Sequence, residues 1–267
     1  MKLLRVGAPG EERPAVRTDD GRLLDLSAVT ADIDGSFLGS GGIDRARAAL
    51  DAGALPETVP DGRAGVLQED DGAFGDRDPG LGGVVTVVEA VVGPHDEVLV
   101  PRGSVKTDWE VELAVVIGRR AGYLEGPDDA AEVIAGYAVS HDASEREFQL
   151  EYSPQWDLGK SCETFNPLGP WMVTADEIGG PQDLELRLGV NGVKRQHGRT
   201  RDMIFPVHQV VAHLSRYLVL EPGDLINTGT PVGVALGLPG TPYLRADGTV
   251  ELEIDGLGGR HQTFGQA

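Results

Sequence analysis

Residues 109–118 (WEVELAVVIG) constrain the fold of this chain more than any other segment, because they combine alternation with an apolar, β-branched run. Such a pattern favours a β-strand. In a strand, Glu110 and Glu112 leave the same face, whereas Val111 and Leu113 point the other way, into a core. The segment therefore predicts a sheet with one packed side and one side that carries two carboxylates.

Most of the other regular segments are also predicted to be strands. The pattern favours strands at residues 1–6, 97–100, 136–141, 184–190, 225–228 and 250–254, and a hairpin at 15–26. Helices are predicted at residues 43–50, 128–134 and 205–218, and the last of these has apolar residues at helical spacing. The predicted fold class is α+β, mostly β.

Changes in composition divide the chain into three parts. Residues 1–60 read as a small N-terminal α/β domain. Residues 61–92 read as an atypical linker or lid region, rich in Gly, Asp and Pro, with strand-like composition at 84–92. Residues 93–267 carry most of the predicted strands and every candidate site residue, so they are predicted to be the catalytic domain.

The acidic charge of the chain limits its partners. It has 23 Lys and Arg against 43 Asp and Glu, a net charge of −20. A surface of this sign repels phosphate backbones and anionic lipids, so neither nucleic acid nor a membrane is expected as a partner. The single cysteine, Cys162, and the lack of a signal-peptide pattern favour the cytoplasm. An anionic substrate would need a local positive centre.

Three carboxylates are candidates for such a centre. Glu110 and Glu112 on one strand face are either two solvated side chains or a pair that shares a divalent cation. Asp142 ends the strand at 136–141, where functional residues gather, although Asp is also a common helix N-cap. Three carboxylates suit a hard ion such as Mg²⁺ or Mn²⁺.

Polar residues in nearby loops could complete a site. Arg146 and Gln149 follow Asp142 in a polar cluster, and Lys160 lies in a Gly- and Pro-rich loop, where it is either a surface residue or a fixed positive charge for a carboxylate. The NTGTPVG turn at 227–233 offers Thr230 and backbone N–H groups, such as that of Gly229, to an anion. No phosphate-loop, GxSxG or HExxH motif is present.

Taken together, these segments resemble the fumarylacetoacetate hydrolase family. The resemblance runs over residues 93–237 and rests on DWEVELAVVIG, GYAVSHDASEREFQ, GKSCETFNPLGPWMVTADEI, VNGVKRQ and LEPGDLINTGTPVG. None of these segments is decisive alone, but their order and spacing are specific in combination.

The resemblance implies a mixed β-sandwich roll, a homodimer, and Mg²⁺ or Mn²⁺ on Glu110, Glu112 and Asp142. It also implies that a small oxo-acid substrate chelates the ion through its carboxylate and keto oxygens, and that the ion stabilises an enolate. Gln149, Lys160 and Thr230 match substrate-contacting positions of the family, and Lys160 is the expected catalytic residue. We expect Gly229 and Arg146, which lie next to them, to contact substrate as well.

One segment departs from the family pattern. Members carry a GLNYxxHxxE-like lid before the metal strand, whose His and Glu activate water, but residues 60–92 contain neither a His nor this motif. The expected function is a metal-dependent hydrolase or lyase of a 2-oxo or 1,3-dicarbonyl acid that cleaves an acylpyruvate-type C–C bond. The alternatives are a tautomerase, isomerase or oxaloacetate-type decarboxylase on the same site, or a non-catalytic homologue that lacks the lid.

Overall fold

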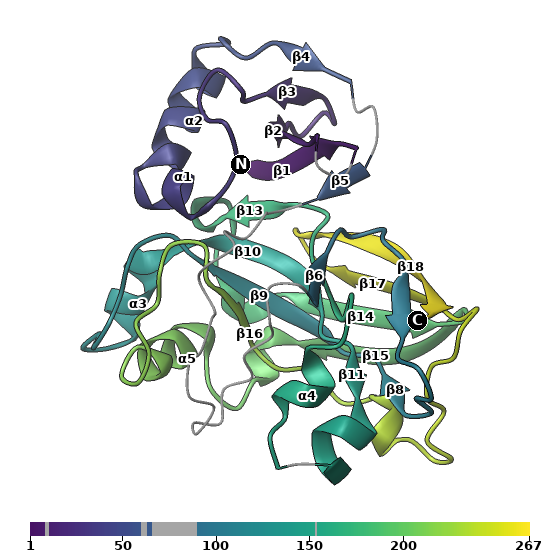
Figure 1. The fold of residues 1–267 in the computed structure, drawn as a ribbon. Helices are drawn as coiled ribbons and strands as arrows, with labels where there is room; N and C mark the ends of the chain where they lie inside the picture. The colour runs from purple at the N-terminus through teal and green to yellow at the C-terminus, as the bar shows by residue number, and fades with distance from the viewer. Residues whose placement is uncertain (9–10, 60–62, 66–89, 153) are drawn as a thin grey trace.

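A nine-stranded sheet organises the molecule, and every residue of its strands β9 (Val111–Ile117) and β10 (Ile134–His141) is buried (Figure 1). The computed structural model describes residues 1–8, 11–59, 63–65, 90–152 and 154–267, with the backbone alone for 63–65. Strands β9 and β10 pair antiparallel, and β16 (Leu225–Asn227) flanks β9. The strand order is β16-β9-β10-β13-β1-β2-β3-β4, with β5 also paired to β1.

The N-terminal residues extend this sheet. Their elements are β1 (Lys2–Gly7), β2 (Arg13–Arg17), β3 (Leu23–Asp25), α1 (Gly35–Gly39), α2 (Gly42–Asp51), β4 (Glu57–Thr58) and β5 (Arg63–Gly65). Strand β1 pairs antiparallel with β13 (Met172–Thr174), which in turn pairs with β10. One sheet therefore runs through the N-terminal unit and the rest of the chain, while the predicted boundaries at 60 and 92 stay a prediction.

A second sheet of five strands packs against β9 and β10. Its order is β15-β14-β17-β18-β7, formed by β14 (Glu185–Val190), β15 (Val193–Arg199), β17 (Thr249–Ile254), β18 (Gly258–Gln266) and β7 (Val98–Val100). Asn191 and Gly192 join β14 to β15 with positive φ at both residues, as the two-residue turn requires. Two short ladders pair β8 (Thr107–Asp108) with β11 (Ser144–Glu145) and β6 (Val91–Val92) with β12 (Asn166–Pro167).

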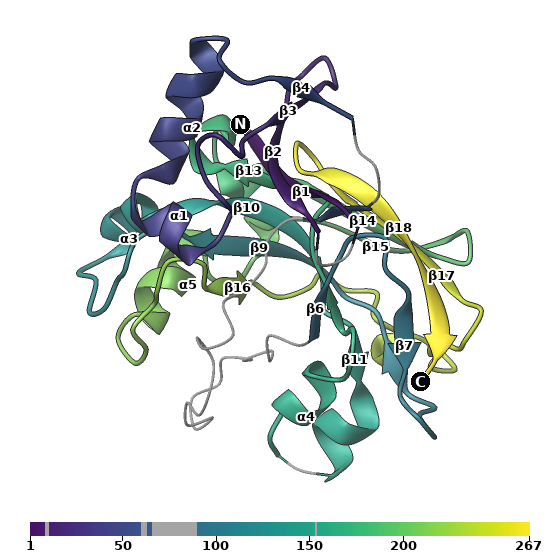
Figure 2. The same ribbon diagram turned by 45° about the horizontal axis from the view of Figure 1, so that its top comes forward.

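The helices that follow residue 90 are short. Helices α3 (Pro127–Val133) and α5 (Val207–Leu214) pack together, and α4 (Asp157–Lys160) follows a π-helical turn at Phe148–Tyr152. Both ribbon views place α4 at the end of the molecule opposite α2 (Figure 2). Single 3₁₀ turns lie at Ala175–Glu177, Pro181–Asp183, Thr200–Asp202 and Ala235–Gly237. In the described part of the chain, no helix has both the length and the apolar character needed to cross a membrane.

The alternation of β9 connects the fold to the site. Leu113 and Val115 join the core between the two sheets, whereas Ala114 and Val116 join a second cluster that α1 and α2 cover. Glu112 lies on the same face as Ala114, further toward the start of the strand. Because both faces of β9 are covered, every residue of the strand is buried.

The mostly β, α+β fold predicted from the sequence is confirmed. Strand β9 begins at Val111, one residue after Glu110, but the carbonyl of Glu110 still accepts from the Asp142 amide at 3.0 Å, so the extended course continues. Residues 66–89 lie outside the described part of the chain. They include most of the predicted strand at 84–92 and most of the segment at 60–92 where the family lid is expected.

Candidate metal-binding site

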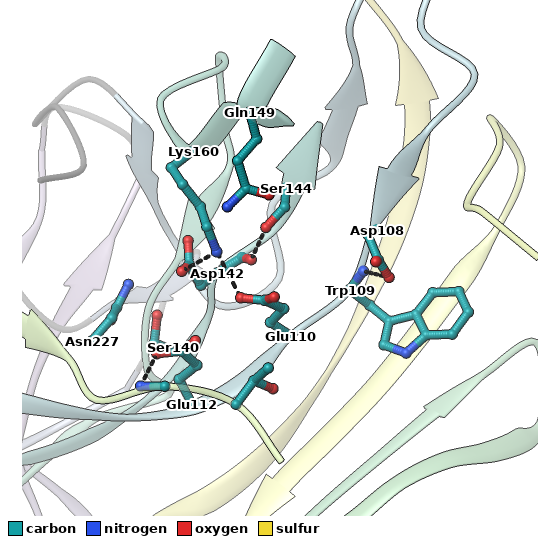
Figure 3. Close-up of polar contacts among 12 residues, drawn as sticks. Asp108, Trp109, Glu110, Glu112, Ser140, Asp142, Ser144, Gln149, Lys160 and Asn227 are labelled. Atoms are coloured by element: carbon teal, nitrogen blue, oxygen red, sulfur yellow. Dashed lines mark hydrogen bonds and ion pairs between the residues drawn. The ribbon is translucent and has the colours of Figure 1, made fainter. Parts of the chain in front are cut away.

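The structure brings three acidic side chains together where β9 begins and β10 ends (Figure 3). Glu110 immediately precedes β9, Glu112 lies in it, and Asp142 immediately follows β10. Each offers a carboxylate oxygen, and these atoms lie within 4.8 Å of one another. The antiparallel register that places Ser140 opposite Glu112 brings the neighbouring Asp142 beside Glu110.

Two simpler interpretations, a solvated strand face and a helix N-cap at Asp142, are excluded by burial and by the strand that follows Asp142. Glu110, Glu112 and Asp142 are 7%, 3% and 2% exposed, so they are not a solvated strand face. Asp142 is followed by β11, not by a helix, so it is not an N-cap. Carboxylates that share a buried space repel one another and need positive charge.

Two buried cations supply part of that charge. The Lys160 ammonium donates to Glu110 Oε2 at 2.6 Å and to Asp142 Oδ2 at 2.5 Å. The Arg146 guanidinium donates to Glu110 Oε1 at 2.5 Å and to Gln149 Oε1 at 2.8 Å. Lys160 therefore lies between two of the carboxylates, and Arg146 holds Glu110 from the other side.

Arg146 is itself held by Asp108, a residue that sequence analysis did not single out. Asp108 is fully buried and accepts from Arg146 Nε at 2.9 Å. Its oxygens also accept from the backbone amides of Trp109, Ala235 and Leu236 at 2.6–3.0 Å. Asp108 thus ties the loop at 235–236 to the guanidinium. Its position two residues before Glu110 was a usable signal, because alternation places the two on one side.

The pKa values of the acidic residues reflect this crowding. Burial raises the pKa of Glu112 well above its ordinary value, and the charges of Asp142 and Glu110 raise it further. Burial also raises the pKa of Asp142, to about 6, although Lys160 opposes the shift. For Glu110 the effect of burial is outweighed by Lys160 and Arg146, which hold the pKa below its ordinary value.

The pKa of Lys160 defines what this residue can do. Burial alone would lower it, but the charges of Asp142, Glu110 and Glu112 raise it above the ordinary value. The ammonium therefore stays protonated at neutral pH. It can serve as a fixed positive charge or a hydrogen-bond donor.

The turn at 227–233 completes the wall of the site. The Gly229 amide donates to Glu112 Oε2 at 2.6 Å, and Gly229 adopts a φ of 97°, which favours glycine. Thr230 Oγ1 donates to the Val111 carbonyl at 2.9 Å and accepts from Gln196 Nε2 at 2.8 Å. Gln196 lies on β15 of the other sheet, and no pattern in the sequence pointed to this contact.

A cleft of about 1050 Å³ opens over these residues. Its lining includes all of the residues predicted to bind metal or substrate, namely Glu110, Glu112, Asp142, Arg146, Gln149, Lys160, Gly229 and Thr230. The apolar residues of the lining include Val91, Trp156, Phe205, Leu225 and Leu236. Whether each residue contacts substrate stays a prediction, but they lie around one space.

Two other reactive side chains do not join this group. His141 faces away from Asp142: its Nδ1 lies 2.6 Å from Gln262 Oε1, and burial lowers its pKa to about 3, so the ring is neutral. Cys162 is partly buried, and burial raises the pKa of its thiol to about 12. Neither side chain lines the cleft.

The donor set fits a hard divalent cation. Four buried carboxyl groups, those of Asp108, Glu110, Glu112 and Asp142, share two buried cations of the described chain, Arg146 and Lys160. Asp142 Oδ1 is buried and has no hydrogen-bond partner among the residues that the structure describes, so a strong acceptor is left over in the cluster. All of the offered ligand atoms are oxygens, which Mg²⁺ and Mn²⁺ prefer.

Comparison with known sequences identifies the family. Residues 77–264 match the fumarylacetoacetate (FAA) hydrolase C-terminal domain, so the chain belongs to this family of enzymes. A protein of Burkholderia multivorans, named only as a candidate hydrolase, is 45% identical over 97% of this chain and 96% of its own length. The resemblance that the sequence motifs indicated is therefore confirmed.

Solved structures support the same assignment. An HpcE-type protein of Mycobacterium smegmatis is 33% identical with a TM-score of 0.83, and the match covers all of both chains. The maleylpyruvate hydrolase of Sphingobium sp. SYK-6, solved with manganese(II) and pyruvate, is 25% identical with a TM-score of 0.77, again over both whole chains. A member of similar fold has thus been seen with a divalent ion and a 2-oxo acid.

Proposed function

We propose that this chain is a Mg²⁺- or Mn²⁺-dependent hydrolase or lyase of a small 2-oxo or 1,3-dicarbonyl acid, with the ion on Glu110, Glu112 and Asp142. The observation that carries the proposal is the convergence of three buried carboxylates within 4.8 Å, one of them with an oxygen that no described residue contacts by a hydrogen bond. The relative that contains manganese and pyruvate supports the choice of ion and substrate class.

The bound ion would supply Lewis-acid polarisation of the 2-oxo group. The protein residues bind and orient the substrate around it. The Lys160 ammonium, fixed beside Glu110 and Asp142, offers a positive charge to the substrate carboxylate. The side chains of Gln149 and Thr230 and the Gly229 region border the cleft, where they can orient the rest of the molecule.

The test is metal binding and turnover in the same protein preparations. Glu112→Gln keeps the size of the side chain and removes the charge, so we expect Mn²⁺ affinity, measured by calorimetry, to fall roughly a hundredfold. Cleavage of acetylpyruvate should disappear with a chelator and return with Mn²⁺. The control is Glu251→Gln on an exposed part of β17, which should change neither. Metal affinity that is unchanged in Glu112→Gln would sink the proposal.

A second candidate is tautomerisation or decarboxylation on the same site. It is favoured by the absence of any His from residues 60–92 and by the orientation of His141 away from the cleft. Hydrolysis needs a base to activate water, whereas these reactions demand less. Assaying oxaloacetate beside acetylpyruvate separates the candidates. Metal binding without turnover of any oxo-acid would instead identify a non-catalytic homologue.

A further inference from the structure

Two asparagines, Asn166 and Asn227, line the cleft together with the carboxylate cluster, and Figure 3 shows Asn227 near Glu112 and Ser140. Asn227 Nδ2 donates to Asn166 Oδ1 at 3.3 Å, and Ser140 Oγ donates to the same oxygen at 2.7 Å. Asn166 and Ser140 are buried, and both asparagines line the cleft together with Glu112. None of these three polar residues has a role in the metal site described above.

The sheet register fixes where this group lies. Ser140 pairs directly with Glu112, and Asn227 pairs with Ala114, the next residue on the same face of β9. Opposed side chains on one face lie about 5 Å apart, and diagonal neighbours about 7 Å apart. Ala114 also pairs with Ala138, so two small side chains leave room for Asn166 to reach both Ser140 and Asn227.

One oxygen of the asparagine pair lacks a hydrogen-bond partner in the described part of the chain. Asn227 Oδ1 is buried and has no partner among the described residues, although a buried amide oxygen normally has one. The oxygen of Asn166, by contrast, accepts two hydrogen bonds. The pair therefore presents one acceptor without a partner, Asn227 Oδ1, together with the amide N–H groups of both asparagines.

The charge of the surroundings decides which group this acceptor suits. Among the described residues that line the cleft, the Lys and Arg side chains are Arg146 and Lys160, which the carboxylates already hold, and Arg216, which follows α5. A second substrate carboxylate placed next to Glu112 would face a like charge. An uncharged group that both donates and accepts hydrogen bonds meets no such penalty.

Building on the proposed function, we propose that Asn166 and Asn227 form an uncharged subsite that binds a hydroxyl, or the enol form of a keto group, on the substrate carbon chain beyond the metal-chelating 2-oxo acid. The hydroxyl donates to Asn227 Oδ1 and accepts from an asparagine N–H. The subsite thus selects 2-oxo acids with a neutral oxygen function over those with a second carboxylate.

The test compares three 2-oxo acids that share the chelating group and lack a hydrolysable 1,3-dicarbonyl. They are 2-oxopentanoate, 4-hydroxy-2-oxopentanoate and 2-oxoglutarate, and binding to the Mn²⁺-loaded protein is measured by calorimetry. We expect the hydroxy acid to bind about fivefold to tenfold more tightly than 2-oxopentanoate, and 2-oxoglutarate not to share the gain.

Two variants and a control assign the effect to the subsite. Asn227→Ala and, as a milder change, Asn227→Ser should abolish the preference for the hydroxy acid and keep 2-oxopentanoate within about twofold. Gln209→Ala, an exposed cleft residue on α5, should keep the preference. A preference that survives in both Asn227 variants, or an equal gain with 2-oxoglutarate, overturns the subsite. If 2-oxopentanoate does not bind in a metal-dependent way, the proposed function fails as well.

Discussion

At the scale of single residues, the site is defined by an imbalance of charge. Within the described part of the chain, the buried carboxyl groups of the site outnumber its buried cations, and Asp142 keeps an oxygen with no hydrogen-bond partner. The imbalance makes protons and divalent ions competitors for the same oxygens. A proton neutralises one carboxylate, whereas a divalent ion neutralises two, so the ion should prevail wherever the carboxyl groups are ionised.

The first residue-scale prediction concerns pH. Because the pKa of Asp142 is raised to about 6, its carboxylate is ionised above this value and takes up a proton below it. We therefore expect Mn²⁺ affinity to fall about tenfold for each pH unit below 6, because a proton then competes with the ion for the Asp142 carboxylate. Calorimetric titrations from pH 5 to 8 measure this. A dissociation constant that does not change with pH would contradict it.

The second residue-scale prediction concerns Asp108. Asp108→Asn keeps the shape of the side chain but leaves the Arg146 guanidinium with one charged partner instead of two. Weakening a buried ion pair in this way should cost about 3 kcal/mol of unfolding free energy, measured by urea denaturation. Glu251→Gln on exposed β17 is the matched control and should change it by less than about 0.5 kcal/mol. A variant as stable as the wild type would show that Asp108 does not anchor the site.

Sequence patterns reach some of these residues and not others. The alternation around Val111 predicted that Glu110 and Glu112 share a face, and the strand end predicted that Asp142 is near a site. The burial of all three could not be predicted, because it depends on distant segments that cover the sheet. Asn166 and Asn227 are 61 positions apart and meet only through the register of the folded sheet.

At the scale of elements, the short α4 and the π-helical turn before it position Lys160 and Gln149. Gly159 makes their packing possible. A Cβ atom there would come within 2.5 Å of both Gln149 Cβ and the Glu145 carbonyl oxygen. The site therefore depends on a close contact between two helical turns that only glycine permits.

Gly159→Ala tests this contact. The added methyl group must push α4 away from the π-helical turn, which separates Lys160 from Glu110 and Asp142. We expect a loss of about 2 kcal/mol in unfolding free energy and a measurable change in Mn²⁺ affinity. Gly179→Ala, where a Cβ meets nothing within 4 Å, is the control and should be nearly neutral. Equal behaviour of the two variants would rule out the packing argument.

Element boundaries show where local patterns stop being informative. The pattern predicted one helix over 205–218, but α5 covers only Val207–Leu214. Pro206 stands at the N-cap and disfavours helical conformation at Phe205, and the chain turns out of the helix after Leu214. The apolar spacing identified the buried face of the helix correctly, whereas its ends depend on proline and on tertiary contacts.

At the scale of the whole molecule, the N-terminal unit and the metal-binding part share one sheet. Strand β1 pairs with β13, and the N-terminal helices cover Ala114 and Val116 on the face that also carries Glu112. Composition predicted a separate N-terminal domain, because a segment rich in Gly, Asp and Pro begins near residue 61. The strand pairing across that change is a long-range contact that composition does not contain.

A truncated chain tests how far the parts depend on each other. A fragment of residues 93–267 loses β1 and the cover over Ala114, Val116 and Met172. We expect it to show no cooperative thermal transition by circular dichroism, because an apolar sheet face is exposed. The full chain, in the same buffer, is the reference. A fragment that melts cooperatively near the temperature of the full chain would establish residues 93–267 as an independent domain.

The alternation along β9 has a consequence for folding as well as for function. A slip of β9 by one residue against β10 would exchange its two faces and drive the carboxylate of Glu112 into the apolar core beside Val139. An unpaired charge there costs many times the energy of a misplaced leucine. The residues proposed to hold the ion thus also disfavour this misaligned pairing of β9 and β10, and they do so without a bound metal ion.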